Sequence, residues 1–60
     1  MNVDDLYYYW NSKSYHRLDE IGCFAFLLQQ IKTTELTEEQ YYKREQMLRE
    51  ITNILESEIL

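Results

Sequence analysis

The sequence of 60 residues predicts a single all-α domain that spans positions 1–60. It has no proline and one glycine, so few residues interrupt a helix. Strong helix formers dominate the second half, and no segment shows the strict alternation of a strand. Apolar residues recur instead at three- and four-residue steps. We expect an antiparallel two-helix hairpin with a short N-terminal helix packed across it, which dimerises into a helical bundle.

The first helix is predicted from the N-terminal segment. Asn2 is a good N-cap residue, and Asp5 follows at the third helical position. One face then collects Val3, Leu6, Tyr7 and Trp10 at i, i+3, i+4 and i+7 spacing. The sequence NSKS at positions 11–14 ends this segment, and Ser12 or Ser14 is expected to cap the next helix.

The second helix is expected over residues 14–33. Its broad apolar face consists of Leu18, Ile21, Phe24, Ala25, Leu28 and Ile31. An alternative remains open, in which Gly22 ends one helix and starts another. It is less favoured because the segment after Gly22 would form only about two turns, which is short for a stable helix.

Phe26 lies outside that face, on a flank shared with Tyr15 and Gly22. A helix that is apolar on two flanks has to be covered on both. We therefore expect the N-terminal helix to fold back so that Leu6 and Trp10 pack beside this flank. Close approach of aromatic rings would also account for glycine in a helix interior, where it costs about 1 kcal/mol relative to alanine.

The third helix is predicted over residues 38–58. Thr37 and Gln40 have the spacing of a capping box, and the two glutamates after Thr37 suit the positive end of the helix dipole. One apolar stripe collects Tyr41, Met47, Leu48, Ile51, Ile54, Leu55 and Ile59. Two i,i+4 ion pairs are expected, Glu39–Lys43 and Glu45–Arg49. The stretch ELTEEQYYKREQML at positions 35–48 resembles turns in many short bacterial and phage helical proteins, and this resemblance implies no function.

The composition argues against several classes of protein. The formal net charge is −5 and the pI is about 4.6, with six basic residues scattered among eleven acidic ones. Binding of nucleic acid requires clustered Lys and Arg, so we expect none. The longest apolar run, CFAFLL at positions 23–28, is too short for a membrane span, which needs about 20 residues. The acidic start MNVDD does not have the pattern of a signal peptide, so a cytoplasmic location is expected.

No catalytic, metal or cofactor site is predicted. Cys23 and His16 are the only cysteine and histidine, and a structural zinc site takes about four such ligands. Seven residues apart on one helix, they would lie about 10 Å apart along its axis, beyond hydrogen-bond reach. Adjacent carboxylates, as at positions 19–20 and 38–39, diverge by about 100° around a helix. We therefore expect no enzymatic activity and no cofactor.

The function expected from these features is the binding of another protein. Tyr8, Tyr9 and Tyr42 are the aromatic residues hardest to bury within one chain, and tyrosine is common at interfaces. Asp4 and Asp5 beside Tyr8 suit a basic surface on the partner. These five residues are the expected contacts of a small acidic regulator or inhibitor that occludes the surface of a partner protein.

The alternative function is a homo-oligomeric structural or assembly protein of bacterial or phage origin. A chain this short leaves apolar surface that a second copy can bury. The residues expected at that contact lie on the stripe of the third helix and are Arg44, Met47, Ile51 and Ile54. Arg44 interrupts the stripe, and a salt bridge from its guanidinium would fix the register of the dimer.

Overall fold

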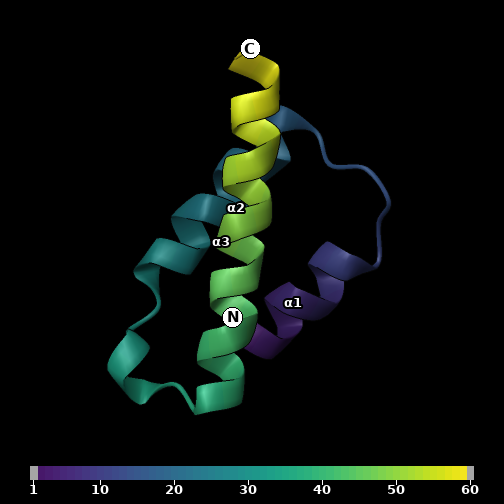
Figure 1. The fold of residues 1–60 in the computed structure, drawn as a ribbon. Helices are drawn as coiled ribbons and strands as arrows, with labels where there is room; N and C mark the ends of the chain where they lie inside the picture. Colours follow the sequence, from purple (N-terminus) through teal and green to yellow (C-terminus); the bar gives the residue numbers. More distant parts are fainter. Residues whose placement is uncertain (1, 60) are drawn as a thin grey trace.

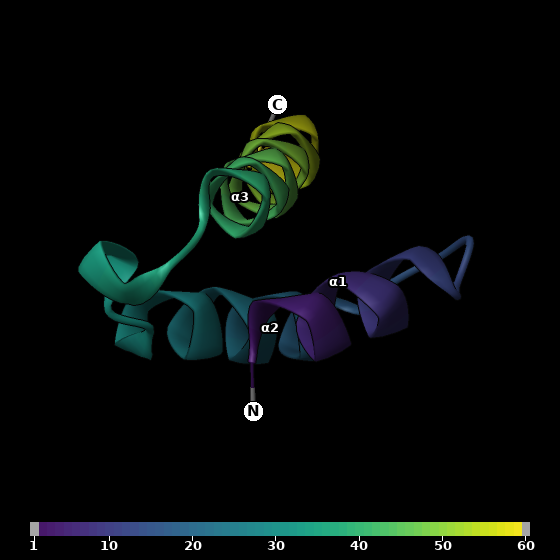
Figure 2. The same cartoon turned by 90° about the horizontal axis from the view of Figure 1, so that it is seen from below.

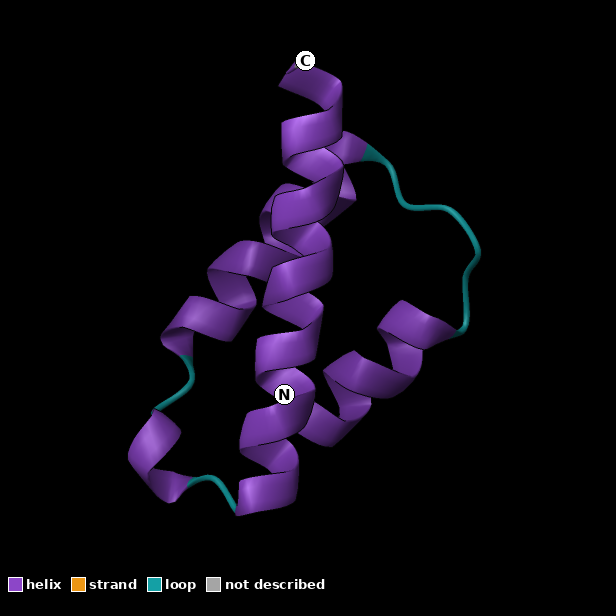
Figure 3. Ribbon diagram, viewed as in Figure 1, coloured by secondary structure: helices purple, strands orange, loops and turns teal. Residues whose placement is uncertain are grey.

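The computed structural model describes the backbone of residues 2–59 and the side chains of residues 2–58. This part of the chain forms three α-helices and no strand, so the all-α prediction is confirmed (Figure 3). In chain order the helices are α1 (Val3–Asn11), α2 (Leu18–Gln30) and α3 (Glu38–Ile59), and a short 3-10 turn, η1 (Thr33–Glu35), precedes α3.

Helix α3 is the longest element, and both other helices pack against it. Its 22 residues span about 33 Å at the rise of an α-helix, close to the longest dimension of the molecule, 35 Å. Figure 1 shows α2 crossing α3 obliquely, with the chain returning along α3 after η1. Figure 2 shows α1 and α2 in one layer on the same side of α3, and both helices contact α3. Among residues 2–59, no helix lies on the face of the α1–α2 layer that points away from α3.

The core draws on all three helices. Its buried members are Val3, Leu6, Trp10, Ile21, Phe24, Leu28, Met47 and Ile51. Each such side chain contributes about 1.5–3 kcal/mol relative to leaving it exposed, which is how a chain of this length is stabilised without a disulfide. Two residues predicted on the stripe of α3, Tyr41 and Leu55, are exposed instead, and the side chain of Ile59 lies outside the described part of the molecule.

Helix α1 begins and ends where the sequence predicts. The Asn2 side chain accepts a hydrogen bond of 2.9 Å from the backbone N–H of Asp5, which confirms the N-cap. After Asn11, both the backbone N–H and the hydroxyl of Ser12 donate to the carbonyl of Tyr9, at 3.2 and 2.7 Å. Ser12 thus closes α1, and its predicted role as the cap of α2 is wrong.

Helix α2 is shorter than predicted, since it begins at Leu18 and ends at Gln30. Residues 13–17 form no helix, and Ser14 is not a cap. This segment connects the C-terminal end of α1 to the N-terminal end of α2, which lie apart (Figure 1). An extended chain spans about 3.3 Å per residue and a helix only about 1.5 Å, so an extended segment bridges this distance with fewer residues. At the other end, the backbone is already extended at Ile31. The helix continues through Gly22, so the alternative with a break there is wrong.

The predicted packing of α1 beside Phe26 is wrong. Phe26 is 61% exposed, Tyr15 is also exposed, and a Cβ added to Gly22 would meet no atom within 4 Å. Helix α1 packs its apolar face against α3 instead, where Val3, Leu6 and Trp10 are buried in the same core as Met47 and Ile51. Leu18, predicted on the broad face of α2, is likewise exposed.

Local interactions start α3 as predicted. Thr37 and Gln40 form the capping box, with the N–H of Gln40 donating to Thr37 Oγ1 at 3.1 Å and the N–H of Thr37 to Gln40 Oε1 at 3.2 Å. The Glu39–Lys43 ion pair is present at 3.4 Å. The pair predicted between Glu45 and Arg49 is absent from the described side chains. The carboxylate of Glu45 contacts Arg44 at 2.8 Å instead, because the Arg44 guanidinium is held at the C-terminal end of α2.

Candidate protein-binding groove

Trp10, in the last turn of α1, fixes the position of this helix. Its indole Nε1–H donates a hydrogen bond of 2.8 Å to Glu50 Oε2 on α3. The ring stacks on His16, with centroids 3.8 Å apart and planes at 8°, and its edge contacts Phe24 of α2 at a centroid distance of 5.1 Å. The Nδ1 atom of His16 is enclosed in this stack without a hydrogen-bond partner among the described residues. Trp10 therefore joins the 12–17 connection and all three helices.

An ion pair attaches the beginning of α1 to α3. The Asp4 carboxylate accepts hydrogen bonds from Lys43 Nζ at 3.0 Å and from Gln40 Nε2 at 3.1 Å. The bond from Lys43, followed by that from Gln40, lowers the pKa of Asp4, and Asp4 in turn raises the pKa of Lys43. Lys43 Nζ also lies 5.4 Å from the centroid of the Tyr7 ring. Helix α1 is thus held to α3 at both ends.

A groove of about 540 Å³ lies between α1 and α2. We call it the α1–α2 groove, and its lining residues are Asp5, Leu6, Tyr8, Tyr9, Glu20, Cys23, Phe24 and Leu27. All of them belong to α1 or α2, and none belongs to α3. Apart from the two carboxylates, the lining is apolar or aromatic.

The α1–α2 groove has a firm floor and accessible walls. Leu6 and Phe24 are core residues, and the ring of Tyr9 stacks on Phe24 with centroids 5.6 Å apart. Leu27 is half-buried, and Cys23 is exposed as a free thiol. Tyr8 is 79% exposed, so its ring stands at the edge of the groove and is available to another molecule.

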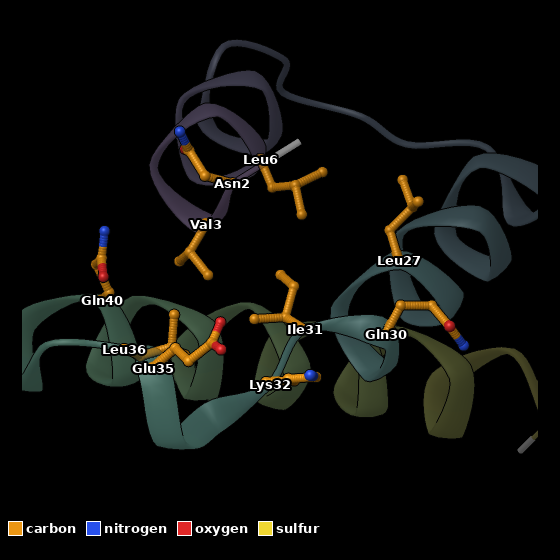
Figure 4. A pocket seen from close by; sticks show the side chains of 10 residues that line it. All are labelled: Asn2, Val3, Leu6, Leu27, Gln30, Ile31, Lys32, Glu35, Leu36 and Gln40. Atoms are coloured by element: carbon orange, nitrogen blue, oxygen red, sulfur yellow. The ribbon is translucent and has the colours of Figure 1, made fainter.

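A second pocket adjoins this groove towards η1. It shares Leu6 and Leu27 with the groove, and its other lining residues are Asn2, Val3, Gln30, Ile31, Lys32, Glu35, Leu36 and Gln40. Figure 4 shows the Leu6 and Leu27 side chains extending from α1 and α2 toward the space between these helices. The two hollows are therefore neighbours along the α1–α2 layer, and the second has the more polar lining.

The carboxylates of the α1–α2 groove lie on opposite walls, Asp5 on α1 and Glu20 on α2. Glu20 Oε2 accepts a hydrogen bond from Lys13 Nζ at 2.9 Å, which lowers the pKa of Glu20 and raises the pKa of Lys13. Lys13 Nζ also lies 5.1 Å from the centroid of the Tyr9 ring, at the edge of the groove. Asp5 makes no ion pair within residues 2–58.

The structure brings together three of the five residues predicted to contact a partner. Asp5, Tyr8 and Tyr9 line the α1–α2 groove. Asp4 lies beside Tyr8 but is held by its ion pair with α3. Tyr42 is exposed on α3, outside the groove.

The four residues predicted for self-association take part in the packing of one chain. Met47 and Ile51 are buried in the core, and Ile54 is partly buried against it. Arg44 is partly buried and donates through Nε to the Leu28 carbonyl at 3.3 Å, in the last turn of α2. Arg44 and Ile54 keep some accessible surface, whereas Met47 and Ile51 have almost none.

Sequence reasoning missed one wall of the groove, formed by Glu20, Cys23 and Leu27 on α2. The signal was present, because spacings of three and four residues place these side chains on one flank of a helix. Leu27 was not part of the predicted broad apolar face of α2. This flank lines a groove because α1 lies next to it, and the sequence pattern did not predict that position of α1.

His16 and Cys23, the only histidine and cysteine of the sequence, lie in different surroundings. His16 lies in the stack on Trp10, whereas Cys23 lines the α1–α2 groove. Within the described residues no three His, Cys, Asp or Glu side chains gather in a way that would hold a metal ion. None of the helices in residues 2–59 has both the length and the apolar character needed to cross a membrane.

Comparison with models of protein families, with curated proteins and with solved structures finds no match to this chain.

Proposed function

We propose that this chain is a non-enzymatic protein-binding module, a small acidic regulator or inhibitor that occludes the surface of a partner protein. The observation that supports this proposal is the α1–α2 groove. Its volume of about 540 Å³ falls in the range of ligand-binding sites, about 300–1,000 Å³, and its lining is mostly apolar. The groove stays open because α1 and α2 both use their remaining faces to pack on α3.

Tyr8 is the residue in the groove on which the proposal depends most. Tyrosine combines a large apolar ring with a polar tip and few rotatable bonds, so it gains contact area at low cost in conformational entropy. Tyr8 has no role in the core, as its exposure shows. Its contribution to binding can therefore be measured without unfolding the protein.

Affinity capture from a cell lysate tests this function. The matched variants are Tyr8→Ala and Tyr15→Ala, because the two tyrosines are exposed to similar degrees, 79% and 76%, and only Tyr8 lines the groove. We expect the wild type and Tyr15→Ala to retain the same specific protein, and Tyr8→Ala to lose it. An identical set of proteins on all three, or none on the wild type, would contradict the proposal.

The remaining predicted contacts, Asp4 and Tyr42, are tested in the same way. Asp4→Asn and Tyr42→Ala alter residues outside the groove, on the sides of α1 and α3. We expect both variants to retain the partner when contact is confined to the groove. Loss of the partner protein by the Tyr42→Ala variant would show that the interface also includes α3.

The second candidate function is self-association, as a structural protein that dimerises into a helical bundle. It is favoured by the exposure of Phe26 and Leu18, two apolar residues of α2 that do not line the groove. Light scattering after size exclusion measures the oligomeric state directly. A dimer that Phe26→Glu converts to a monomer would support this function, and a monomeric wild type would exclude it.

A further inference from the structure

We propose that the occupant of the α1–α2 groove is an α-helical segment of another protein, with apolar residues along one face and Lys or Arg beside them. This inference rests on the proposed function and specifies the chemistry of the partner. Three properties of the groove support it: the kind of contact it offers, its shape and its charge.

A partner in the groove would contact side chains, because the described residues form no β-strand whose edge could pair with it. Residues 2–59 form no strand, so an extended peptide has no ladder of backbone groups to pair with here. An extended segment would carry unpaired N–H and C=O groups into an apolar hollow, which is costly. A helix satisfies its own backbone hydrogen bonds and presents only side chains, so it suits such a groove.

The hollows between α1 and α2 extend over more than one helical turn. The α1–α2 groove and the second pocket share Leu6 and Leu27 in their linings, so the two hollows are neighbours along the layer. Helices bind such grooves through residues at i, i+3, i+4 and i+7. The accessible parts of Tyr8, Cys23 and Leu27 provide the apolar surface for these residues.

The charge of the groove selects basic residues on that helix. Asp5 and Glu20 stand on opposite walls, and none of the described lining residues is basic. Asp5 is unpaired among the described side chains, whereas Glu20 shares its carboxylate with Lys13, an exposed pair that a Lys or Arg of the partner can replace at little cost. The net charge of −5 adds long-range attraction to a basic partner.

The same charges argue against a second copy of this chain in the groove. The exposed Leu55 near the end of α3 is flanked by Glu56 and Glu58. This segment would bring carboxylates against Asp5 and Glu20. Like charges in close contact weaken binding, so a different and basic protein is the better occupant.

Matched synthetic peptides test the proposal. The probe is a leucine-based amphipathic helix whose polar face carries Lys, the first comparison has Glu at the same positions, and the second keeps Lys but has prolines that prevent the helix. Fluorescence anisotropy of labelled peptides gives the dissociation constants. We expect the Lys peptide to bind at least about tenfold more tightly than either comparison, with affinity that falls as salt is added.

Variants of the protein locate the binding. Leu27→Gln should weaken binding of the Lys peptide about tenfold, while the matched control Phe26→Gln, at the next position but outside the groove, should leave it unchanged. Asp5→Asn should weaken the Lys peptide and not the Glu peptide. Circular dichroism checks that each variant is folded, and Tyr8→Ala, at an exposed position, replaces Leu27→Gln if that variant unfolds.

The outcomes separate this inference from the proposed function. Equal binding of the Lys and Glu peptides, binding of the proline peptide, or no binding of any peptide would overturn the inference. So would self-association that Leu27→Gln abolishes, since the occupant would then be a second copy. In each of these cases, a lysate protein that is lost only on Tyr8→Ala would still support the proposed function.

Discussion

The indole of Trp10 and the carboxylate of Glu50, forty residues apart in sequence, are joined by a hydrogen bond of 2.8 Å. Trp10 is buried in the core and Glu50 is partly buried on α3, so the bond lies at the edge of the core. Because it holds the end of α1 against α3, it also sets the position of α1 next to α2. The α1–α2 groove exists only while α1 is held in this place.

Replacement of Trp10 should therefore be the most damaging change in α1. Trp10→Ala is expected to lower the free energy of unfolding by about 3–5 kcal/mol, because it removes a buried aromatic ring. Trp10→Phe keeps much of the ring contact but loses the bond to a charged acceptor, at a cost of about 1.5–3 kcal/mol. Urea denaturation followed by circular dichroism measures both, and an unchanged midpoint for Trp10→Ala would show that α1 is not docked.

Gly22→Ala should stabilise the protein. Gly22 lies within α2, its backbone is not in the left-handed region, and an added Cβ meets no atom within 4 Å. The gain is expected to be about 1 kcal/mol, the difference in helix propensity between the two residues. The control is Gln29→Ala on the same helix, which should change stability by less than about 0.5 kcal/mol. A lower melting temperature for Gly22→Ala would mean that something approaches this position closely.

Thr37→Ala tests the start of α3. It removes the hydroxyl that accepts the N–H of Gln40 at 3.1 Å, and loss of such a cap typically costs about 1 kcal/mol. Thr37→Ser retains the acceptor and should restore most of the stability. A drop in melting temperature of equal size for both variants would show that the methyl group, rather than the capping bond, stabilises this site.

The Asp4–Lys43 pair predicts a dependence of stability on pH. Asp4 has a lowered pKa, so its contribution is present above the pKa of an unfolded aspartate, about 4, and is lost as the pH falls through the folded value. Lys43 has a raised pKa, so its contribution is present below the pKa of an unfolded lysine, about 10.4, and is lost as the pH rises through the folded value.

A double-mutant cycle of Asp4→Asn and Lys43→Met isolates this pair. The coupling between the two substitutions, measured by thermal denaturation, should be favourable at pH 7 and should become smaller as the pH falls through the pKa of Asp4 in the folded protein. High salt should also reduce it, because both side chains are at the surface. A coupling that does not change with pH would indicate contact of the side-chain stems rather than charge.

The local structure of this protein follows from its sequence more closely than its packing does. The caps at Asn2 and Thr37 and the end of α1 at Asn11 depend on neighbours within a few residues, and each was predicted at its observed place. Residues 14–17 were wrongly predicted to belong to the second helix, because their path depends on how far apart the ends of α1 and α2 come to lie.

The packing of α1 shows why the rest could not be predicted. Helical periodicity identified its apolar face, but two surfaces were available to cover it, the flank of α2 near Phe26 and the stripe of α3. The sequence pattern does not compare the areas that these two arrangements would bury, and the contact with α3 is the one formed. Three groove residues, Asp5, Tyr8 and Tyr9, were predicted from α1 alone, whereas the α2 wall became apparent only with both helices in place.

Cys23 allows the most direct test of the claim that the groove is the binding site. It is the only cysteine of the chain, it is exposed, and it lines the α1–α2 groove, so a bulky maleimide attached to it blocks the groove. The control protein, Cys23→Ser with Gln29→Cys, carries the same label on an exposed part of α2 outside the groove. We predict that the label at position 23 abolishes capture of the partner from lysate and that the label at position 29 does not. Equal capture by the two labelled proteins would contradict the account.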